Sequence, residues 1–154
     1  MQARPVKNCY RTENTREESL SAFELDGRID KDSELVKKLD LCQLRLQNDS
    51  RWPWLVMVPE RNGMSEIFDL SPSDQALLSV EVNRVAAAFR EITGATKINV
   101  GALGNIVRQL HVHVIARFEG DPNWPGPVWG FGQAVPYEQS QKQNLIKKLV
   151  EALS

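Results

Sequence analysis

The chain has 154 residues, of which 42% are hydrophobic and 25% are charged, and its formal net charge is −1. This balance is typical of a globular protein and excludes an intrinsically disordered one. The near-neutral charge leaves no basic excess to bind a nucleic-acid polymer or an anionic membrane, although a small phosphorylated ligand needs only a local site. The sequence shows no run that approaches the roughly 20 apolar residues of a membrane span, and residues 1–8 lack the apolar stretch that is typical of a signal peptide. We therefore expect a single cytoplasmic domain over residues 1–154.

The two cysteines, Cys9 and Cys42, are too few for a disulfide scaffold and match a reducing compartment. Neither belongs to a Cys-x-x-Cys pair, so a structural zinc site is not expected. A bridge between Cys9 and Cys42 is the alternative that the sequence leaves open.

The first part of the chain predicts an irregular lead-in followed by a β-hairpin. Residues 1–20 are polar with little periodicity, and we expect residues 30–39 to form a turn or a short helix. Residues 41–47 alternate between apolar and polar side chains, and residues 54–58 form a β-rich run that ends at a proline. The turn-forming residues 48–51 between these runs favour an antiparallel hairpin.

Residues 72–92 carry a strong helix signal. Ser71 is a favourable N-cap, Pro72 suits the first helical position and Gly94 suits the C-cap. An apolar stripe with helical spacing runs between these signals, formed by Leu78, Val82, Val85, Phe89 and Ile92.

The remaining elements complete an α+β domain with an antiparallel sheet. We expect its core to span about residues 20–120, followed by a C-terminal loop and helix over 120–154. The elements expected after the long helix are a strand over 97–101, a glycine-containing turn over 101–105, a strand over 108–117, an ordered loop over 120–136 and a helix over 137–154. The inward positions of that last helix are Ile146, Leu149, Val150 and Leu153.

Both histidines of the chain, His111 and His113, lie in the segment 108–117. Apolar and polar residues alternate there, which predicts a half-buried strand with both imidazoles on its polar face. At a rise of about 3.3 Å per residue, their Cα atoms would lie roughly 7 Å apart. Because imidazole suits proton transfer and nucleophilic attack near pH 7, the pair predicts a reaction centre.

Three interpretations of this pair are open from the residues alone. It can be structural or solvent-facing, or it can hold a metal ion with Glu119 or Asp121 completing the ligands. It can instead transfer a phosphoryl or nucleotidyl group. One imidazole would then attack phosphorus, and a protonated neighbour would stabilise the phosphate oxygens or protonate the leaving group. The turn over 101–105 would supply backbone N–H donors to the phosphate.

The sequence Gln-Leu-His-Val-His-Val-Ile at 109–115 resembles the histidine triad motif, His-φ-His-φ-His-φ-φ, in which φ is apolar. The likeness covers roughly residues 40–118, and Trp-Pro-Gly-Pro-Val-Trp-Gly at 124–130 resembles a bacterial subgroup of that superfamily. It implies a HIT-like fold with an antiparallel sheet of about five strands, and a homodimer. Other similar segments are Leu-Val-Met-Val-Pro at 55–59, Asp-Leu-Ser at 69–71, Asn-Val-Gly at 99–101 and Gly-Asn at 104–105.

By this resemblance His111 is the nucleophile that becomes nucleotidylated, and His113 contacts the phosphate and its leaving side. Gln109 stands where the first motif histidine is expected. It can keep a hydrogen bond that orients the site, but it cannot carry a proton charge at pH 7. Two more positions depart from the family pattern, because Ile106 replaces a serine or threonine and Asn62 lies near a frequent histidine.

The resemblance also implies nucleotide-binding residues. Asn48 lies at the hairpin turn, where the family contacts ribose, and Asn99 matches an asparagine near the phosphate and sugar. Asn105 occupies the place of a polar residue that holds the α-phosphate. Each asparagine can instead stabilise a turn through hydrogen bonds of its side chain to the backbone. The four tryptophans are expected mainly in packing, with one or two able to stack on a base: Trp52, Trp54, Trp124 and Trp129.

We therefore expect a hydrolase or nucleotidyl transferase that acts on a nucleoside phosphate, phosphoramidate or dinucleotide. The reaction would pass through a covalent His111 intermediate and would require no metal or other cofactor. A catalytically reduced nucleotide-binding or sensor protein is the first alternative, and a His-x-His metal site is the second.

Overall fold

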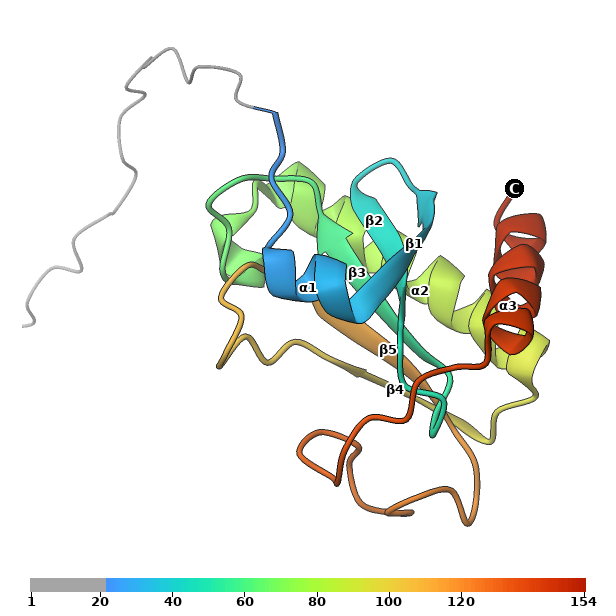
Figure 1. The fold of residues 1–154 in the computed structure, drawn as a ribbon. Coiled ribbons are helices and arrows are strands. Elements are labelled where there is room, and N and C mark those ends of the chain that lie inside the picture. Colours follow the sequence, from blue (N-terminus) through green and yellow to red (C-terminus); the bar gives the residue numbers. More distant parts are fainter. Residues whose placement is uncertain (1–21) are drawn as a thin grey trace, which may run out of the picture.

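The computed structural model describes residues 22–154, so the lead-in expected over 1–20 and Cys9 lie outside the described residues. Five antiparallel strands form one sheet in the order β1-β2-β3-β5-β4 (Figure 1). The expected α+β class and sheet are confirmed. The elements are α1 (Gly27–Asp32), β1 (Ser33–Lys38), β2 (Cys42–Gln47), β3 (Trp54–Pro59), the 3₁₀ turn η1 (Ile67–Asp69), α2 (Pro72–Thr93), β4 (Lys97–Gly101), β5 (Val112–Arg117) and α3 (Gln139–Ala152).

The prediction for residues 30–39 was wrong in part. The short helix α1 lies earlier than expected, and a strand follows it directly, because β1 pairs antiparallel with β2. β1 is an edge strand whose register shifts between Leu35 and Lys37. Its side chains are mostly polar, and Val36 alone joins the hydrophobic core from it. An edge strand of this kind lacks the clear alternation by which the neighbouring β2 is recognised.

The long helix α2 agrees with its predicted caps. The Ser71 hydroxyl accepts a hydrogen bond from the Asp74 N–H at 3.1 Å, and Pro72 occupies the first turn. Gly94 ends the helix in the left-handed conformation, with φ of 68°, where a side chain would be strained. Phe89 is fully buried on the face that packs against the sheet.

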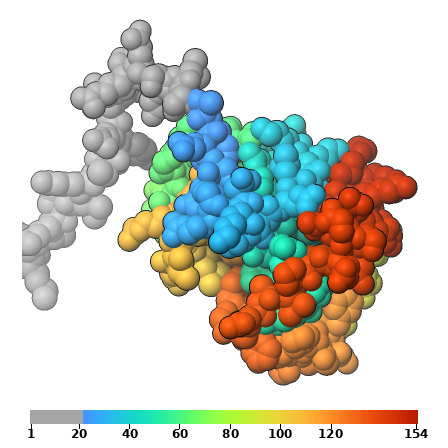
Figure 2. Space-filling model, viewed as in Figure 1, coloured from blue at the N-terminus to red at the C-terminus, as the bar shows by residue number. Residues whose placement is uncertain are grey.

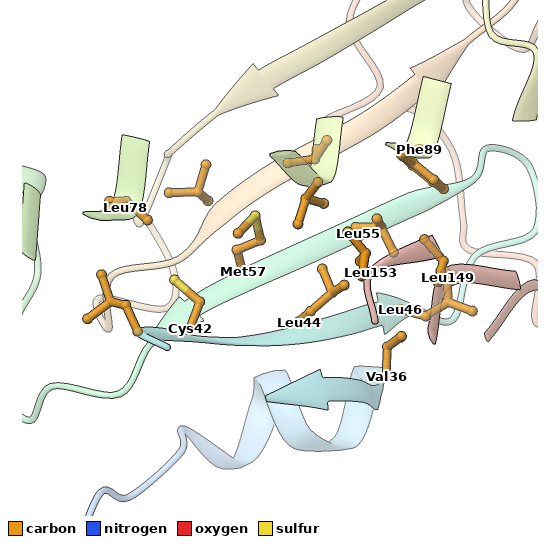
Figure 3. Close-up of a cluster of buried hydrophobic side chains, with 14 of the residues drawn as sticks. Val36, Cys42, Leu44, Leu46, Leu55, Met57, Leu78, Phe89, Leu149 and Leu153 are labelled. Atoms are coloured by element: carbon orange, nitrogen blue, oxygen red, sulfur yellow. The ribbon is translucent and has the colours of Figure 1, made fainter. Parts of the chain in front are cut away.

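Two hydrophobic clusters cover the two faces of the sheet. The first packs α2 and α3 against strand residues such as Leu44 and Met57, as Figure 3 shows. Leu149 of α3 and Leu153 directly after it are buried in this cluster, and Ile146 and Val150 pack against it. The second cluster covers the opposite face of the sheet and consists of Ile29, Trp52, Trp54, Val56, Val58, Ile115 and Val128.

The histidine strand is shorter and more buried than expected. β5 begins at Val112, so His111 precedes it, and all six residues of β5 are buried. The predicted polar face is covered because the second cluster, including Val128 from the loop after β5, lies over it.

None of the helices within residues 22–154 combines the length and the apolar character that a membrane span requires.

The segment between β5 and α3 is an ordered loop, as predicted. The buried Arg117 at the end of β5 holds it by pairing with Asp121 at 2.7 Å and by donating to the Gly126 carbonyl at 2.9 Å. Trp124 lies against the same guanidinium, 5.5 Å from ring centroid to Cζ. The loop is thereby fixed over the face of the sheet that carries the histidines.

Candidate active site

His111 and His113 lie side by side, with ring centroids 4.9 Å apart and an interplanar angle of 81°. His113 is on β5, paired with Val56 of β3 and with Gly101 of β4. His111 lies just before the strand begins, where the backbone leaves the sheet. The sheet therefore fixes one imidazole, and the second needs a separate contact to orient it.

That contact is made by the main chain two residues earlier. Nδ1 of His111 lies 2.7 Å from the carbonyl oxygen of Gln109. A carbonyl oxygen only accepts hydrogen bonds, so Nδ1 carries a hydrogen. In the neutral ring the lone pair is then on Nε2, the state that a nucleophilic imidazole requires.

His113 has the opposite tautomer. The indole Nε1 of Trp54 donates to Nδ1 of His113 at 2.9 Å. Because Nδ1 accepts this bond, the neutral ring carries its hydrogen on Nε2. Burial, with a smaller contribution from the charge of His111, lowers the pKa of His113 to about 3. The expected protonated neighbour is thus corrected: His113 is a neutral N–H donor near pH 7.

Aromatic rings pack around His113 and shield most of its side chain from solvent. Trp54 and Trp129 both meet it edge to face, at centroid distances of 5.4 and 5.6 Å. A Cβ on Gly101 would lie 3.1 Å from Cη2 of Trp129, so the glycine gives the indole room beside the strand. Trp52 is fully buried in the same cluster. These tryptophans serve packing, as expected, and two of them also contact a predicted site residue.

A pocket of about 140 Å³ opens beside the two imidazoles. Its other walls come from α1, from the end of β2, from β3 and from the loop before β5. Arg28 and Asp32 bring opposite charges to the α1 wall. Neither residue was expected in the site, because the turn or short helix was predicted later in the chain, over residues 30–39. The lining residues are Arg28, Ile29, Asp32, Gln47, Val56, Val107, His111 and His113.

Gln47 takes the place in this pocket that was expected for Asn48. The Asn48 side-chain oxygen instead accepts from the Tyr137 N–H at 3.1 Å, which anchors the segment just before α3. Gln47 follows Gln43 and Arg45 along β2 at a spacing of two, and Arg45 pairs with Val56 of the pocket wall. The alternation of β2 therefore contained the signal for Gln47.

The structure does not place the other two asparagines among the residues that line the pocket. Asn99, on β4, accepts from the Arg117 guanidinium at 3.1 Å and helps to hold the loop after β5. Asn105 is exposed in the loop between β4 and β5, next to the exposed Ile106. That loop flanks His111, since Gly104 borders a small hollow of about 10 Å³ beside it.

The side chain of Gln109 is directed to the segment before α1. Its amide accepts from the Asp26 N–H and donates to the Glu24 carbonyl, both at 2.8 Å. The residue therefore orients His111 through its main-chain oxygen, while its side chain lines a separate groove of about 540 Å³ together with Asn62.

A metal site receives no support from the described part of the chain. Within residues 22–154 no group of three or more His, Cys, Asp or Glu side chains is placed to hold an ion. Asp121, one of the expected third ligands, pairs with Arg117. Both Nδ1 atoms of the histidine pair already have partners.

Comparisons with known proteins identify the family of this chain. Residues 28–120 match the model of the HIT domain. The chain belongs to the histidine triad family. A histidine triad protein from Sinorhizobium meliloti 1021 is 57% identical, with a TM-score of 0.83 over 84% of this chain and 96% of that one.

More distant members of the family share the same fold. A histidine triad protein from Bradyrhizobium japonicum is 41% identical, with a TM-score of 0.86 over 87% of this chain and all (100%) of that one. A hypothetical histidine triad nucleotide-binding protein from Sulfolobus tokodaii strain7 is 18% identical, with a TM-score of 0.61 over 79% of this chain and 83% of that one. No curated protein matches the chain.

Proposed function

We propose that this histidine triad protein is a nucleotide hydrolase or nucleotidyl transferase that uses His111 as its nucleophile. One observation carries the proposal. The Gln109 carbonyl leaves the lone pair of His111 on Nε2, beside a neutral imidazole whose Nε2 carries a hydrogen, at the edge of a pocket. A nucleophile next to an uncharged donor suits attack on an anionic phosphate, whose oxygens accept that hydrogen bond.

The covalent step follows from these two tautomers. Nε2 of His111 attacks the α-phosphorus of a nucleoside phosphate, phosphoramidate or dinucleotide and forms an N–P bond. The bond from phosphorus to the amine or phosphate leaving group breaks, and its electron pair departs with that group, which takes a proton from water. His113 donates from Nε2 to a phosphoryl oxygen throughout, and Nδ1 of His111 keeps its hydrogen on the Gln109 carbonyl.

The second step releases the nucleotide. Water, or the hydroxyl of an acceptor in the transferase case, attacks phosphorus and breaks the N–P bond. The electron pair returns to Nε2 of His111, and the proton of the attacking hydroxyl passes to solvent. No metal or other cofactor enters this chemistry. We assign ligand contacts to the residues of the pocket wall, Arg28, Asp32 and Gln47, ahead of Asn48, Asn99 and Asn105.

The test is rapid quenching followed by intact mass measurement. Purified protein is mixed with adenosine and guanosine phosphoramidates, dinucleoside polyphosphates or nucleoside diphosphates. We expect a nucleotidyl adduct that is absent from His111→Ala, while that variant still shows a thermal shift with the nucleoside monophosphate. An adduct that persists in His111→Ala would overturn the assignment of the nucleophile.

The alternative is a nucleotide-binding protein with reduced catalysis. The observation that favours it is the exposed Ile106, at a position where the resemblance leads to a serine or threonine near the phosphate. Thermal stabilisation by nucleotides with no adduct and no product would establish this alternative. At 100 times Kd, binding stabilises the folded state by about 2.7 kcal/mol, which is readily measured.

We further propose that the protein acts in the cytoplasm as a homodimer joined at the edge strand β4. Val100 of β4 lies on the face of the sheet that α2 covers, because it pairs with the core residue Val114, yet half of it (50%) is exposed. A second copy would cover both this side chain and the unpaired edge. We expect Val100→Lys to sediment as a monomer, and the equally exposed Val135→Lys to sediment like the wild-type protein.

A further inference from the structure

Two amide side chains hold the segment that leads into α1. Asn62 accepts from the Glu24 N–H at 3.1 Å and donates to the Ala22 carbonyl at 3.2 Å. Gln109 accepts from the Asp26 N–H and donates to the Glu24 carbonyl, both at 2.8 Å. The backbone of residues 22–26 thus forms alternate hydrogen bonds with two side chains, as a strand does with the peptide groups of a neighbour.

The chemistry of the primary amide explains this arrangement. Asn and Gln carry a donor and an acceptor on one planar group, which resembles a peptide unit. The two nitrogens of an imidazole point in diverging directions, so a histidine could satisfy only one of the two backbone groups that each amide contacts. Gln109 stands where the resemblance to the family leads to a histidine, and Asn62 lies near another such position. The amides at positions 62 and 109, which both differ from the family pattern, therefore hold the same backbone segment, residues 22–26.

The held segment continues directly into a wall of the pocket. Asp26 caps α1 by accepting from the Arg28 N–H at 2.8 Å. Arg28 in turn donates to the Ile106 carbonyl at 3.1 Å, in the loop that leads to Gln109. Figure 2 shows the residues of this segment and of α1, in blue, packed beside the gold residues of that loop. Arg28, Ile29 and Asp32 of α1 line the pocket with both histidines.

We propose that Gln109 and Asn62 are positioning residues that fix α1 as the nucleotide-binding wall of the pocket. The proposal rests on the function proposed above. Gln109 links two parts of the site, because its main-chain oxygen orients His111 while its side chain holds the segment before α1. Removal of the Gln109 side chain leaves the carbonyl in place, so it affects ligand binding and spares the orientation of the nucleophile.

The experiment compares Gln109→Ala, Gln109→His and Asn62→Ala with the wild-type protein. The control is Gln75→Ala, which removes a similar side-chain bond to a carbonyl, that of Leu70, at the start of α2. Deuterium exchange over residues 22–32 reports the segment, and titration with adenosine 5′-monophosphate reports the pocket. Adduct formation from an adenosine phosphoramidate at saturation reports the chemistry.

We expect all three site variants to exchange faster over residues 22–32 and to bind adenosine 5′-monophosphate about tenfold more weakly. The rate of adduct formation at saturation should stay within about twofold, and Gln75→Ala should match the wild-type protein in all three measurements. A Gln109→His variant with wild-type exchange and affinity would overturn the proposal. So would a slower saturated rate with unchanged affinity, or a wild-type protein that does not bind the monophosphate.

The two proposals fail in different ways. If the wild-type protein binds adenosine 5′-monophosphate but forms no adduct, the covalent mechanism falls. Exchange and affinity would still decide the positioning role in that case. If the adduct forms and Gln109→Ala leaves exchange and affinity unchanged, the positioning role falls while the mechanism stands.

Discussion

The indole N–H of Trp54 donates to Nδ1 of His113, and this one bond at 2.9 Å selects the tautomer of the buried imidazole. Trp54 is on β3 and His113 on β5, the adjacent strand, so the sheet itself sets the geometry of the bond. The result is a neutral ring with its hydrogen on Nε2. A charged donor at this place would need the indole bond to break.

Trp54→Phe should therefore allow the hydrogen of the neutral His113 ring to occupy either nitrogen. The variant leaves a buried Nδ1 without its donor, which we expect to lower the free energy of unfolding by about 1–3 kcal/mol. Imidazole ¹⁵N chemical shifts should change from the Nε2–H tautomer to a mixture. Trp124→Phe, at a ring that lies against the Arg117 guanidinium, should leave those shifts unchanged. Retention of the pure tautomer in Trp54→Phe would contradict the assignment.

The stability of the protein should depend on pH through His113. Burial lowers its folded pKa to about 3 from 6.5, so between these values the unfolded state binds more protons and stability falls as the pH falls. From pH 7.5 to pH 5 the loss from this group is about 2 kcal/mol, at about 1.4 kcal/mol per pH unit below 6.5. Well above pH 6.5, where the imidazole is neutral in both states, this group contributes almost no dependence.

Denaturant titrations of the wild-type protein and of His113→Asn measure this difference. The variant cannot take up the proton, so its stability should fall by about 2 kcal/mol less over the same interval. Parallel curves for the two proteins would show that His113 titrates normally in the folded state.

The sequence predicted the helix that has local signals at its ends, but it did not predict the contacts that hold the segment before α1. The caps of α2 at Ser71 and Gly94 are contacts within a few residues, and they appear in the structure as expected. The amide of Gln109, in contrast, binds Glu24 and Asp26, more than 80 residues away. No periodicity carries information about such a contact, and α1 is too short to show a stripe.

In the candidate site, too, local features could be predicted and contacts between distant residues could not. The adjacency of His111 and His113 follows from their spacing, whereas the tautomers on which their proposed roles rest depend on Trp54 and on a main-chain oxygen. The expectation of a protonated neighbour failed because the sequence pattern suggested a solvated face, whereas loop residues after β5 bury it. The alternation of β2 places Gln47 on the same face as Arg45, and the pairing of Arg45 with Val56 shows that this face borders the pocket.

The Arg117–Asp121 pair should be essential to the loop over the site. Burial alone would raise the pKa of Asp121, but hydrogen bonds from Arg117 and from the Phe118 N–H hold it below its usual value. Both side chains are almost fully buried, at 1% and 6% exposed. Asp121→Asn leaves the guanidinium without its counter-charge, so we expect the free energy of unfolding to fall by about 3–5 kcal/mol.

The exposed pair Lys147–Glu151 supplies the matched control. Glu151→Gln removes one charge from an i,i+4 pair in solvent, so the free energy of unfolding should change by less than about 0.5 kcal/mol. Denaturant midpoints measure both variants. Equal, small effects of the two substitutions would show that Asp121 does not stabilise the fold through Arg117.

Cys42 should be unreactive until the protein unfolds. Its thiol is free and fully buried, and burial, reinforced by the neighbouring Glu81 carboxylate, raises its pKa far above the usual value. Because the thiolate is the reactive form, a thiol reagent should not modify it in the native state. In a Cys9→Ser background we expect no modification over hours in buffer and one modified thiol in guanidinium. Rapid modification in buffer would contradict the burial of Cys42. Without reductant, unfolded wild-type protein should give two modified thiols, whereas a Cys9–Cys42 bridge would give none.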